Sequence, residues 1–434
     1  MEDPQEMPLT FNTRMESMFM IRRVLLAAVA LTMIGLCSTP CLAADNVVSA
    51  SKKGSLIIFP KILTVSGVDT IITVANDYPN SVLVKCYWMD SYQRSWDFTF
   101  PLTAYQPVWF AASTGIGSIE VAGFGVDKEG ELKCWAIKAL PDPQNPANTI
   151  ETQISWNDLY GSALIIGPDP PAATEYTAFA FAARNVARGG AVISPPDTTP
   201  GNLILNGSFS DAGYDACPAY LVFNFFAEQA SVTNGELGQD EVGIAPCKQD
   251  LVIVPCRQDL RQDNSPVCTK AKFDIWNENE AKFTGSYQCV KCWFEGLLSE
   301  IGTREWKQCD LISGKCKFTG VGGKKFTAAY LKTDLGRFRV LPESFAACTG
   351  VFSKIGQDGK TPVDVCANAA NQVKTPFLGL LLTGLDCTGE NLYTSRFFAT
   401  MPTLAGAWTA GAPSQPIPGV LWDPGSGDQN AAKR

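Results

Sequence analysis

The chain of 434 residues contains no histidine. Histidine is the usual general acid and base near neutral pH and a common metal ligand. Its absence excludes Ser-His-Asp and Cys-His triads, His-ligated zinc or copper, and haem attachment through a CxxCH motif. Carboxylate chemistry, calcium binding, all-cysteine metal sites and plain binding stay open.

Basic charge is also scarce, since 35 Lys and Arg residues face 43 Asp and Glu residues for a net charge of −8. A protein that binds nucleic acid usually carries a basic surface that neutralises phosphates. An acidic surplus provides no such attraction. We therefore expect no nucleic-acid partner.

An apolar run long enough to span a bilayer as a helix, about 20 residues, is lacking. The run Val24–Cys37 is shorter, follows Arg22 and Arg23, and precedes small residues up to Ala44. This three-part pattern predicts a secretory signal peptide with an upstream overhang within residues 1–44. The protein should then be exported to the periplasm, the outer surface or the extracellular space.

The other long apolar stretch is Phe377–Leu385, which is too short to cross a membrane as a helix. We therefore expect no transmembrane segment after signal cleavage. Partners would be further copies of this chain or other proteins of the envelope or extracellular space.

Helical periodicity is rare, whereas short runs of β-branched and aromatic residues recur about every ten residues between turn formers. In the first half these runs are Gly54–Val65, Asp69–Asp77, Ser81–Asp90, Ser95–Thr103 and Gln106–Thr114. Such spacing is typical of antiparallel sandwiches. We predict a mainly β fold with two β-sandwich-like, immunoglobulin-like domains that contain disulfides.

Residues 193–202, ISPPDTTPGN, contain three prolines and no apolar period, which predicts a linker. The N-terminal β-sandwich domain would then cover residues 45–192. A cysteine-rich C-terminal β domain would cover residues 203–412. Residues 413–434 are rich in Pro, Gly and Ser, which predicts a flexible tail.

Thirteen cysteines follow the predicted signal peptide, and in an exported chain such a number first indicates disulfides. Only Cys86 and Cys134 precede the linker, and each lies in an apolar strand-like run. Pairing with each other is the simplest expectation. In the chain-entropy model such a bridge stabilises the domain by about 3 to 4 kcal/mol.

Eleven cysteines remain for the second domain, which is an odd number. The segment Pro246–Leu260, PCKQDLVIVPCRQDL, repeats a motif after nine residues, so a duplication would have copied one cysteine. Residues nine apart in an unbroken strand face opposite sides of a sheet. We expect one copy to lie in a sheet and the other in a loop or bulge.

Cys289 and Cys292 form a CxxC pair inside a strand-like run rather than at a helix start, where a reactive thiolate is expected. Together with Cys309 and Cys316 they approach a four-cysteine zinc or iron–sulfur pattern, although the second spacing is too wide. A disulfide between Cys309 and Cys316 is the competing interpretation. We expect no cofactor and no catalytic residue.

Aromatic residues between positions 87 and 109 could form a sugar-binding platform, although aromatic residues in a sandwich are more often core. The set is Tyr87, Trp88, Tyr92, Trp96, Tyr105 and Trp109. Carboxylates that could accompany it are Asp90, Asp97, Glu278, Glu280 and Glu295.

The chain resembles a group of uncharacterised exported bacterial proteins. The resemblance is carried by GSLIIFPKI, DTIITVAND, VKCYWMD, DFTFPLTAYQPVWFAAS, GELKCWAI, CPAYLVFNFFAEQ, LVIVPCRQDL, KFDIWNENEAKFTGSYQC and RVLPESFAACTGVF. It implies two β-rich domains and an exported location, and no activity. Its single LxLVPC segment matches the copy at Cys256, which implies that Cys247 is the added, unpaired cysteine.

These patterns favour an exported, non-enzymatic structural or binding protein of the cell envelope or extracellular space, stabilised by disulfides. One alternative is a carbohydrate-binding or carbohydrate-active protein that uses aromatic platforms and carboxylates. A second alternative is an all-cysteine metal or redox protein.

Overall fold

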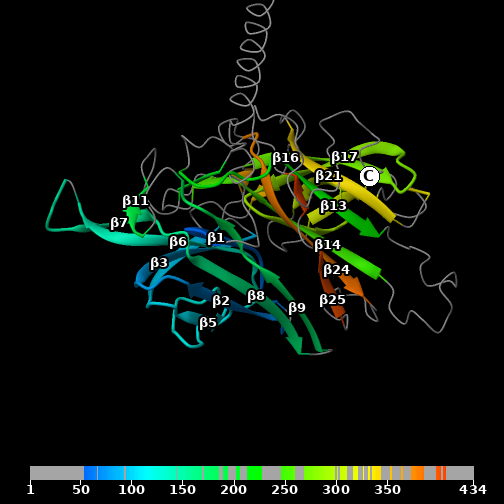
Figure 1. Ribbon diagram of the computed structural model, residues 1–434. Helices are drawn as coiled ribbons and strands as arrows, with labels where there is room; N and C mark the ends of the chain where they lie inside the picture. The colour runs from blue at the N-terminus through cyan, green and yellow to red at the C-terminus, as the bar shows by residue number, and fades with distance from the viewer. Residues whose placement is uncertain are drawn as a thin grey trace, which may run out of the picture. The chain divides into compact units, whose positions relative to one another are not determined.

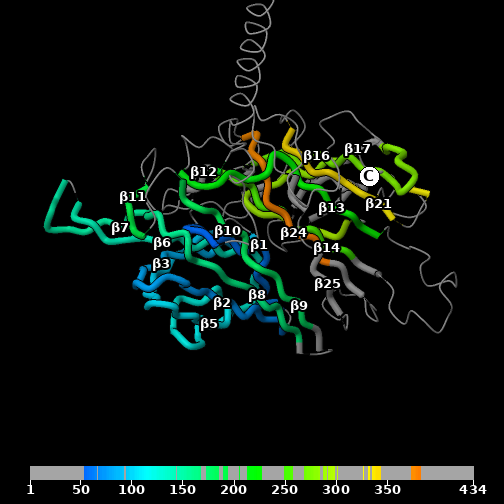
Figure 2. The backbone as a smooth tube through the Cα atoms, in the orientation of Figure 1, coloured from blue at the N-terminus to red at the C-terminus, as the bar shows by residue number. Residues whose placement is uncertain are grey.

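Antiparallel strands dominate the computed structural model, shown as a ribbon in Figure 1 and as a tube in Figure 2. The structure describes residues 53–65, 67–91, 94–142, 144–168, 171–184, 189–193, 202–205, 213–226, 246–259, 268–298, 301, 304–309, 316–320, 326, 331–332, 335–343, 352–353, 363–364, 373–385, 397–401 and 404–406. The predicted mainly β fold is confirmed.

The first sheet has the strand order β10-β1-β6-β3-β4, with β7 added beside β6 and β11 beside β7. Its strands are β1 (Leu56–Leu63), β3 (Val82–Asp90), β4 (Ser95–Leu102), β6 (Glu129–Pro141), β7 (Thr149–Ser155), β10 (Phe179–Phe181) and β11 (Ala191–Val192). Strands β1, β6 and β3 run side by side in Figure 1.

A second sheet has the order β5-β2-β8-β9. Its strands are β2 (Asp69–Asn76), β5 (Pro107–Ala111), β8 (Leu159–Pro168) and β9 (Pro171–Thr177). Residues alternate in burial along them; in β5, Val108 and Phe110 are buried whereas Pro107 and Trp109 are exposed. Side chains of a strand alternate between the two faces of its sheet, so this sheet has one core face and one solvent face.

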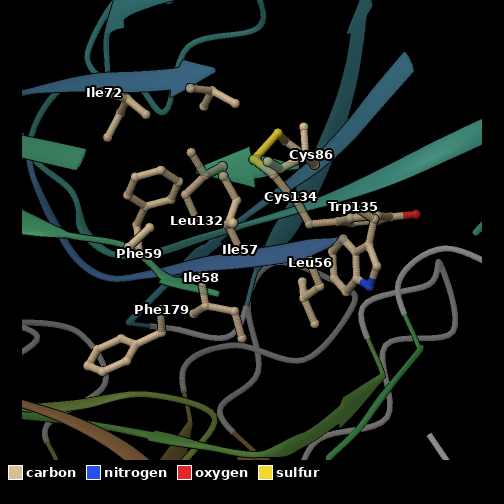
Figure 3. Close-up of a cluster of buried hydrophobic side chains, with 14 of the residues drawn as sticks. Leu56, Ile57, Ile58, Phe59, Ile72, Cys86, Leu132, Cys134, Trp135 and Phe179 are labelled. Carbon is tan, nitrogen blue, oxygen red and sulfur yellow. A yellow bond between two sulfur atoms is a disulfide. The ribbon is translucent and has the colours of Figure 1, made fainter. Parts of the chain in front are cut away.

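Strand β1 is buried along its whole length. β1 contacts strands β8 and β2 of the second sheet, and it also contacts the C-terminal strands β14 and β24. Burial on both sides explains why LIIFPKIL is a nearly continuous apolar run rather than an alternating one. Figure 3 shows this part of the core, with Ile57 and Phe59 on β1 among the buried side chains.

The C-terminal half contains two larger sheets, ordered β17-β16-β21-β13-β26 and β18-β14-β24-β25. Their strands are β13 (Tyr220–Phe226), β14 (Pro246–Pro255), β16 (Cys268–Asn277), β17 (Lys282–Lys291), β18 (Phe294–Leu297), β21 (Leu335–Glu343), β24 (Phe377–Leu385), β25 (Phe397–Met401) and β26 (Leu404–Gly406). Shorter pairs join β12 (Asn202–Ile204) to β15 (Arg257–Asp259), β19 (Arg304–Cys309) to β20 (Cys316–Gly320), and β22 (Phe352–Ser353) to β23 (Val363–Asp364).

Strand β14 contributes to two hydrophobic cores, because its successive side chains point to opposite faces of the sheet. Leu251 and Ile253 belong to the C-terminal core with Phe223 and Phe273, whereas Val252 belongs to the core that contains β1. The same alternation places Asp250 on the side of Val252, because residues two apart in a strand share a face. An acid is thereby directed towards the N-terminal half.

The larger core takes residues from both sides of residues 193–202, and residues 46–434 form one compact unit. The division into domains 45–192 and 203–412 and the immunoglobulin-like assignment stay predictions. The signal peptide, most of the linker and the tail at 413–434 lie outside the described residues. Within the part of the chain that is described, no helix has the length and apolar character needed to span a membrane.

Asp274 on β16 provides a testable electrostatic contribution to the C-terminal sheet. Its carboxylate accepts a hydrogen bond from Arg339 at 2.6 Å and lies 3.4 Å from Lys282 Nζ. Burial alone raises the pKa of Asp274, but the hydrogen bond and charge of Arg339, together with Lys282, outweigh it and lower the pKa. A carboxyl group with a lowered pKa stabilises the fold above its ordinary pKa and loses this effect as the pH falls.

We therefore expect Asp274→Asn to lower the free energy of unfolding at neutral pH by about 1 to 2 kcal/mol, a value discounted because the Lys282 side chain is half exposed. The difference from wild type should shrink as the pH falls below about 4, where the unfolded carboxyl group becomes protonated. Urea titrations at several pH values would measure it. Asp97→Asn, at a 42% exposed side chain, is the control and should change stability little. A difference between Asp274→Asn and wild type that does not vary with pH would contradict this account.

Candidate functional site

A bulge in β1 presents Lys61 to the C-terminal half. The pairing of β1 with β6 shifts register between Phe59 and Ile62, where Pro60 and Lys61 lie. Such a shift bends a strand and redirects a side chain. Proline also has no N–H to donate to a ladder, so the bulge suits its position.

Side chains from distant segments complete the hydrogen bonds of this bulge. The Tyr176 hydroxyl accepts a hydrogen bond from the Lys61 backbone N–H at 3.0 Å and donates one to the Lys61 carbonyl oxygen. Trp293 Nε1 donates to the Pro60 carbonyl oxygen at 2.7 Å. Buried backbone groups need such partners, so these contacts hold the bulge in one conformation.

The Lys61 ammonium group donates hydrogen bonds to Asp250 on β14 and, at 2.5 Å, to Glu295 Oε1 on β18. We call these three residues the Lys61 triad. Their side chains are 0%, 4% and 13% exposed, in that order. Asp250 pairs with Leu297 and Val252 pairs with Glu295, so the two acids are diagonal neighbours on one face of adjacent strands.

Burial and the attraction between opposite charges shift the pKa values of the triad residues in opposite directions. Burial lowers the pKa of Lys61, but the charges and hydrogen bonds of both acids outweigh it and raise that pKa overall. Burial, followed by the charge of Glu295, raises the pKa of Asp250 well above its ordinary value despite Lys61. The triad therefore favours a charged lysine beside one protonated and one ionised carboxyl group.

A second buried pair lies on β6, where Lys133 donates a hydrogen bond to Glu131. The two residues are two apart and so share a face of the strand. Burial lowers the pKa of Lys133, and the charges of Glu131 and Cys292 only partly offset it. Glu131 and Glu295 both act electrostatically on Tyr176, which connects this pair to the Lys61 triad.

The cysteines of the N-terminal half form a disulfide. Cys86 on β3 and Cys134 on β6 are register partners whose Cα atoms are 4.1 Å apart. Close cross-strand pairs of this kind bring their side chains together. Figure 3 shows the disulfide among buried apolar side chains.

In the C-terminal half, Cys256 forms a disulfide with Cys217. Cys256 lies in the bend between β14 and β15, whereas Cys247 lies in β14 beside a register shift between Pro246 and Gln249. The two copies of the repeat thus have different backbone environments, as their odd offset predicts. The Cys247 side chain lies outside the described residues, so its unpaired state stays a prediction.

The other cysteines singled out in the sequence are partly described. Cys289 is disulfide-bonded, as is Cys268, and a disulfide sulfur is not the thiolate that zinc requires. Cys309 and Cys316 are register partners across β19 and β20, but their side chains lie outside the described residues. In the described part of the chain, no group of three Cys, Asp or Glu side chains is arranged to hold a metal ion. Disulfides persist mainly in exported proteins, so the two bridges Cys86–Cys134 and Cys217–Cys256 fit an exported location.

The aromatic set divides between core and surface. Tyr87 and Trp88 are buried, and Trp96 stacks on Phe124. Trp109 and Tyr105 are exposed, whereas Tyr92 lies outside the described residues.

The named acids are likewise dispersed. Asp90 is buried and bonded to Arg94, and Asp97 contacts Lys85. Glu278 and Glu280 lie at an exposed turn after β16. Glu295 contacts the buried Lys61 as part of the Lys61 triad.

The solvent side of the sheet β5-β2-β8-β9 is largely apolar. We call it the outer face; its described and at least partly exposed residues are Asp69, Ile71, Thr73, Pro107, Trp109, Ala111, Tyr160, Ser162, Leu164, Ile166, Ala173, Glu175 and Thr177. Trp109 and Tyr160 are 48% and 44% exposed. The four strands contain no lysine or arginine, and Asp69 and Glu175 are their only charged residues. Exposed apolar patches of this kind commonly mark binding surfaces.

The outer face also carries hydroxyl groups between its aromatic residues. Trp109 on β5 pairs with Thr73 on β2, and Tyr160 on β8 pairs with Ala75 on β2. Trp109 and Tyr160 are therefore separated by two strand spacings across the sheet and by two residues along it, which is roughly 12 Å in a regular sheet. Thr73 Oγ1 and Ser162 Oγ lie 2.9 Å apart on the same face. The face therefore combines two aromatic surfaces with central hydrogen-bonding groups.

No family model matches the chain, and no curated protein matches it. Among solved structures, the PBSX exported protein XepA is 9% identical, with 69% of this chain and 85% of that chain covered and a TM-score of 0.15. A protein from Parabacteroides distasonis ATCC 8503 that is described as secreted is 10% identical, with 69% and 88% covered and a TM-score of 0.16. At these TM-scores we take neither fold nor function from either structure.

Proposed function

We propose that the chain is an exported, non-enzymatic structural or binding protein of the cell envelope or extracellular space, and that it binds through the outer face. The apolar outer face with exposed Trp109 and Tyr160 carries this proposal. Tryptophan and tyrosine are the residues on which binding energy most often concentrates. An apolar sheet face without basic residues suits a protein partner, the simplest being a second copy of this chain.

The buried acids support the non-enzymatic part of the proposal. Asp250, Glu295 and Glu131 are acids with a lysine partner in the core, and all three are largely withdrawn from solvent. A carboxyl group that acts on a dissolved substrate must contact it directly or through one water molecule. The triad lies instead within the protein, where it contacts the chain itself.

Replacing Trp109 and Tyr160 with alanine tests the binding surface. Each substitution should weaken self-association by about 2 kcal/mol, roughly thirtyfold, if these residues are hot spots. Sedimentation velocity over a concentration series measures this, and retention of the protein by isolated envelopes tests other protein partners. Leu335→Ala, at an exposed apolar residue on β21, is the matched control and should change neither readout. Wild-type association and envelope retention in the double variant would sink the proposal.

Carbohydrate binding is a second candidate, favoured by the hydroxyl groups of Thr73 and Ser162 between Trp109 and Tyr160. Sugars stack on aromatic rings while their hydroxyl groups hydrogen-bond to nearby polar side chains. Titration with soluble polysaccharides should then change the tryptophan fluorescence of the wild type, and Thr73→Val should weaken polysaccharide binding. An unchanged signal with every polysaccharide would reject this candidate.

A further inference from the structure

The Lys61 triad contains the reactants of a condensation reaction within one chain. An amine and a carboxylic acid can join with loss of water, and Lys61 Nζ is in hydrogen-bond contact with Asp250. Holding two reacting groups in contact replaces a bimolecular encounter with an intramolecular one, which can lower a barrier by about 7 to 11 kcal/mol. The bulge fixed by Tyr176 and Trp293 holds the amine in place.

Glu295 occupies the position that proton transfer requires. Its Oε1 lies 2.5 Å from Lys61 Nζ, and its side chain also hydrogen-bonds Asp250. A group within hydrogen-bond distance of both reactants can accept a proton from one and deliver a proton to the other.

We infer that Lys61 Nζ and the Asp250 carboxyl group condense into an intramolecular amide, an isopeptide bond, with Glu295 as the proton-transferring residue. The inference is independent of the function of the outer face. The bond would join β1 to β14 covalently and so link the N-terminal and C-terminal halves of the chain.

The reaction balances without any co-reactant. The Glu295 carboxylate takes one proton from the Lys61 ammonium group, and the neutral amine attacks Cγ of the protonated Asp250. The C–N bond forms as the Cγ–OH bond breaks. The hydroxyl group leaves as water with a second proton from the nitrogen, relayed through Glu295, and Glu295 ends protonated.

The surroundings favour the product. The charges of Lys61 and Glu295 both disappear, because Lys61 becomes part of a neutral amide and Glu295 ends protonated, which removes the desolvation penalty of an ion pair in the core. Burial of the triad also limits the access of water that would reverse the reaction. Burial and Glu295 raise the pKa of Asp250, which favours the carboxylic acid, the form with hydroxyl as leaving group.

Peptide mapping of the full wild-type protein tests the inference. After reduction and alkylation, trypsin should not cleave at a modified Lys61, so residues 54–85 should remain attached to residues 249–257. The linked species should weigh one water molecule less than the two peptides together. Cleavage after Lys85, whose carboxylate partners Asp97 and Glu151 are 42% and 40% exposed, is the internal control for an unmodified lysine.

Two variants make the result specific. Lys61→Arg keeps a positive charge but cannot form the amide, so it should release free peptides 54–61 and 249–257. Glu295→Gln keeps the size of the side chain and should leave the link unformed in folded protein, as judged by near-ultraviolet circular dichroism. Folded wild-type protein that releases both free peptides in full yield overturns the inference. A link at full yield in Glu295→Gln overturns the role of Glu295.

Discussion

Cys256→Ser is expected to lower the free energy of unfolding by about 2 to 5 kcal/mol, whereas Cys247→Ser should leave it unchanged. Cys256 forms a disulfide with Cys217 across a sequence separation of 39 residues. In the chain-entropy model a loop of that length contributes about 4 kcal/mol. The Cys256 side chain is also buried, so its loss affects packing as well.

The backbone around this disulfide explains why the effect should be large. Leu205 N–H donates to the Cys256 carbonyl oxygen at 2.8 Å, and Cys217 N–H donates to the Leu205 carbonyl oxygen at 3.1 Å. Cys256 N–H in turn donates to the Pro376 carbonyl oxygen at 2.9 Å. The disulfide thus holds three segments around a buried leucine, and all three should loosen together without it.

Guanidinium titration of the variants measures these changes, and a thiol count on the unfolded, unreduced protein reports the number of bridges. Cys217→Ser should lower the free energy of unfolding as much as Cys256→Ser does. The double variant should be no less stable than either single variant, because both substitutions remove the same disulfide. Cys247→Ser should leave the number of bridges as in wild type. An equal loss of stability in Cys247→Ser would show that Cys247 is also paired.

Local patterns in the sequence predicted the strands well. The ten-residue spacing from Gly54 to Thr114 predicted strands that the structure places at β1 to β5. Turn residues and β-branched runs act over a few neighbours, so they can be read from one segment at a time. The outward position of Trp109 was not predicted, because the sequence of β5 is apolar throughout and alternates only in burial.

The Lys61 triad was not predicted, because it depends on contacts between residues 189 and 234 positions apart. A local signal did exist: Lys61 interrupts an apolar run, and a lysine inside such a run is rarely buried without a partner. Glu295 was noted as a carboxylate, but its partners were not. Pairing across sheets is set by tertiary packing, which neither propensity nor spacing specifies.

The ion pairing alone predicts that Lys61→Ala lowers the free energy of unfolding by about 3 to 5 kcal/mol, because the substitution leaves Asp250 and Glu295 buried without their ammonium partner. Lys61→Met keeps most of the side-chain volume and should give a similar loss, since the missing charge dominates. Lys85→Ala is the control: Lys85 contacts two half-exposed acids, so its loss should be below about 1 kcal/mol.

Denaturant titrations of these variants also bear on the isopeptide bond. A covalent link across a separation of 189 residues adds about 5 kcal/mol in the chain-entropy model. If the bond forms, every variant at Lys61 loses this covalent contribution and also leaves Asp250 and Glu295 buried without the lysine. A loss well above 5 kcal/mol in both Lys61→Ala and Lys61→Met therefore indicates the bond, and a loss within 3 to 5 kcal/mol indicates the ion triad alone. A loss in Lys61→Met below about 1 kcal/mol would contradict both, because it would mean that the buried acids do not need the lysine.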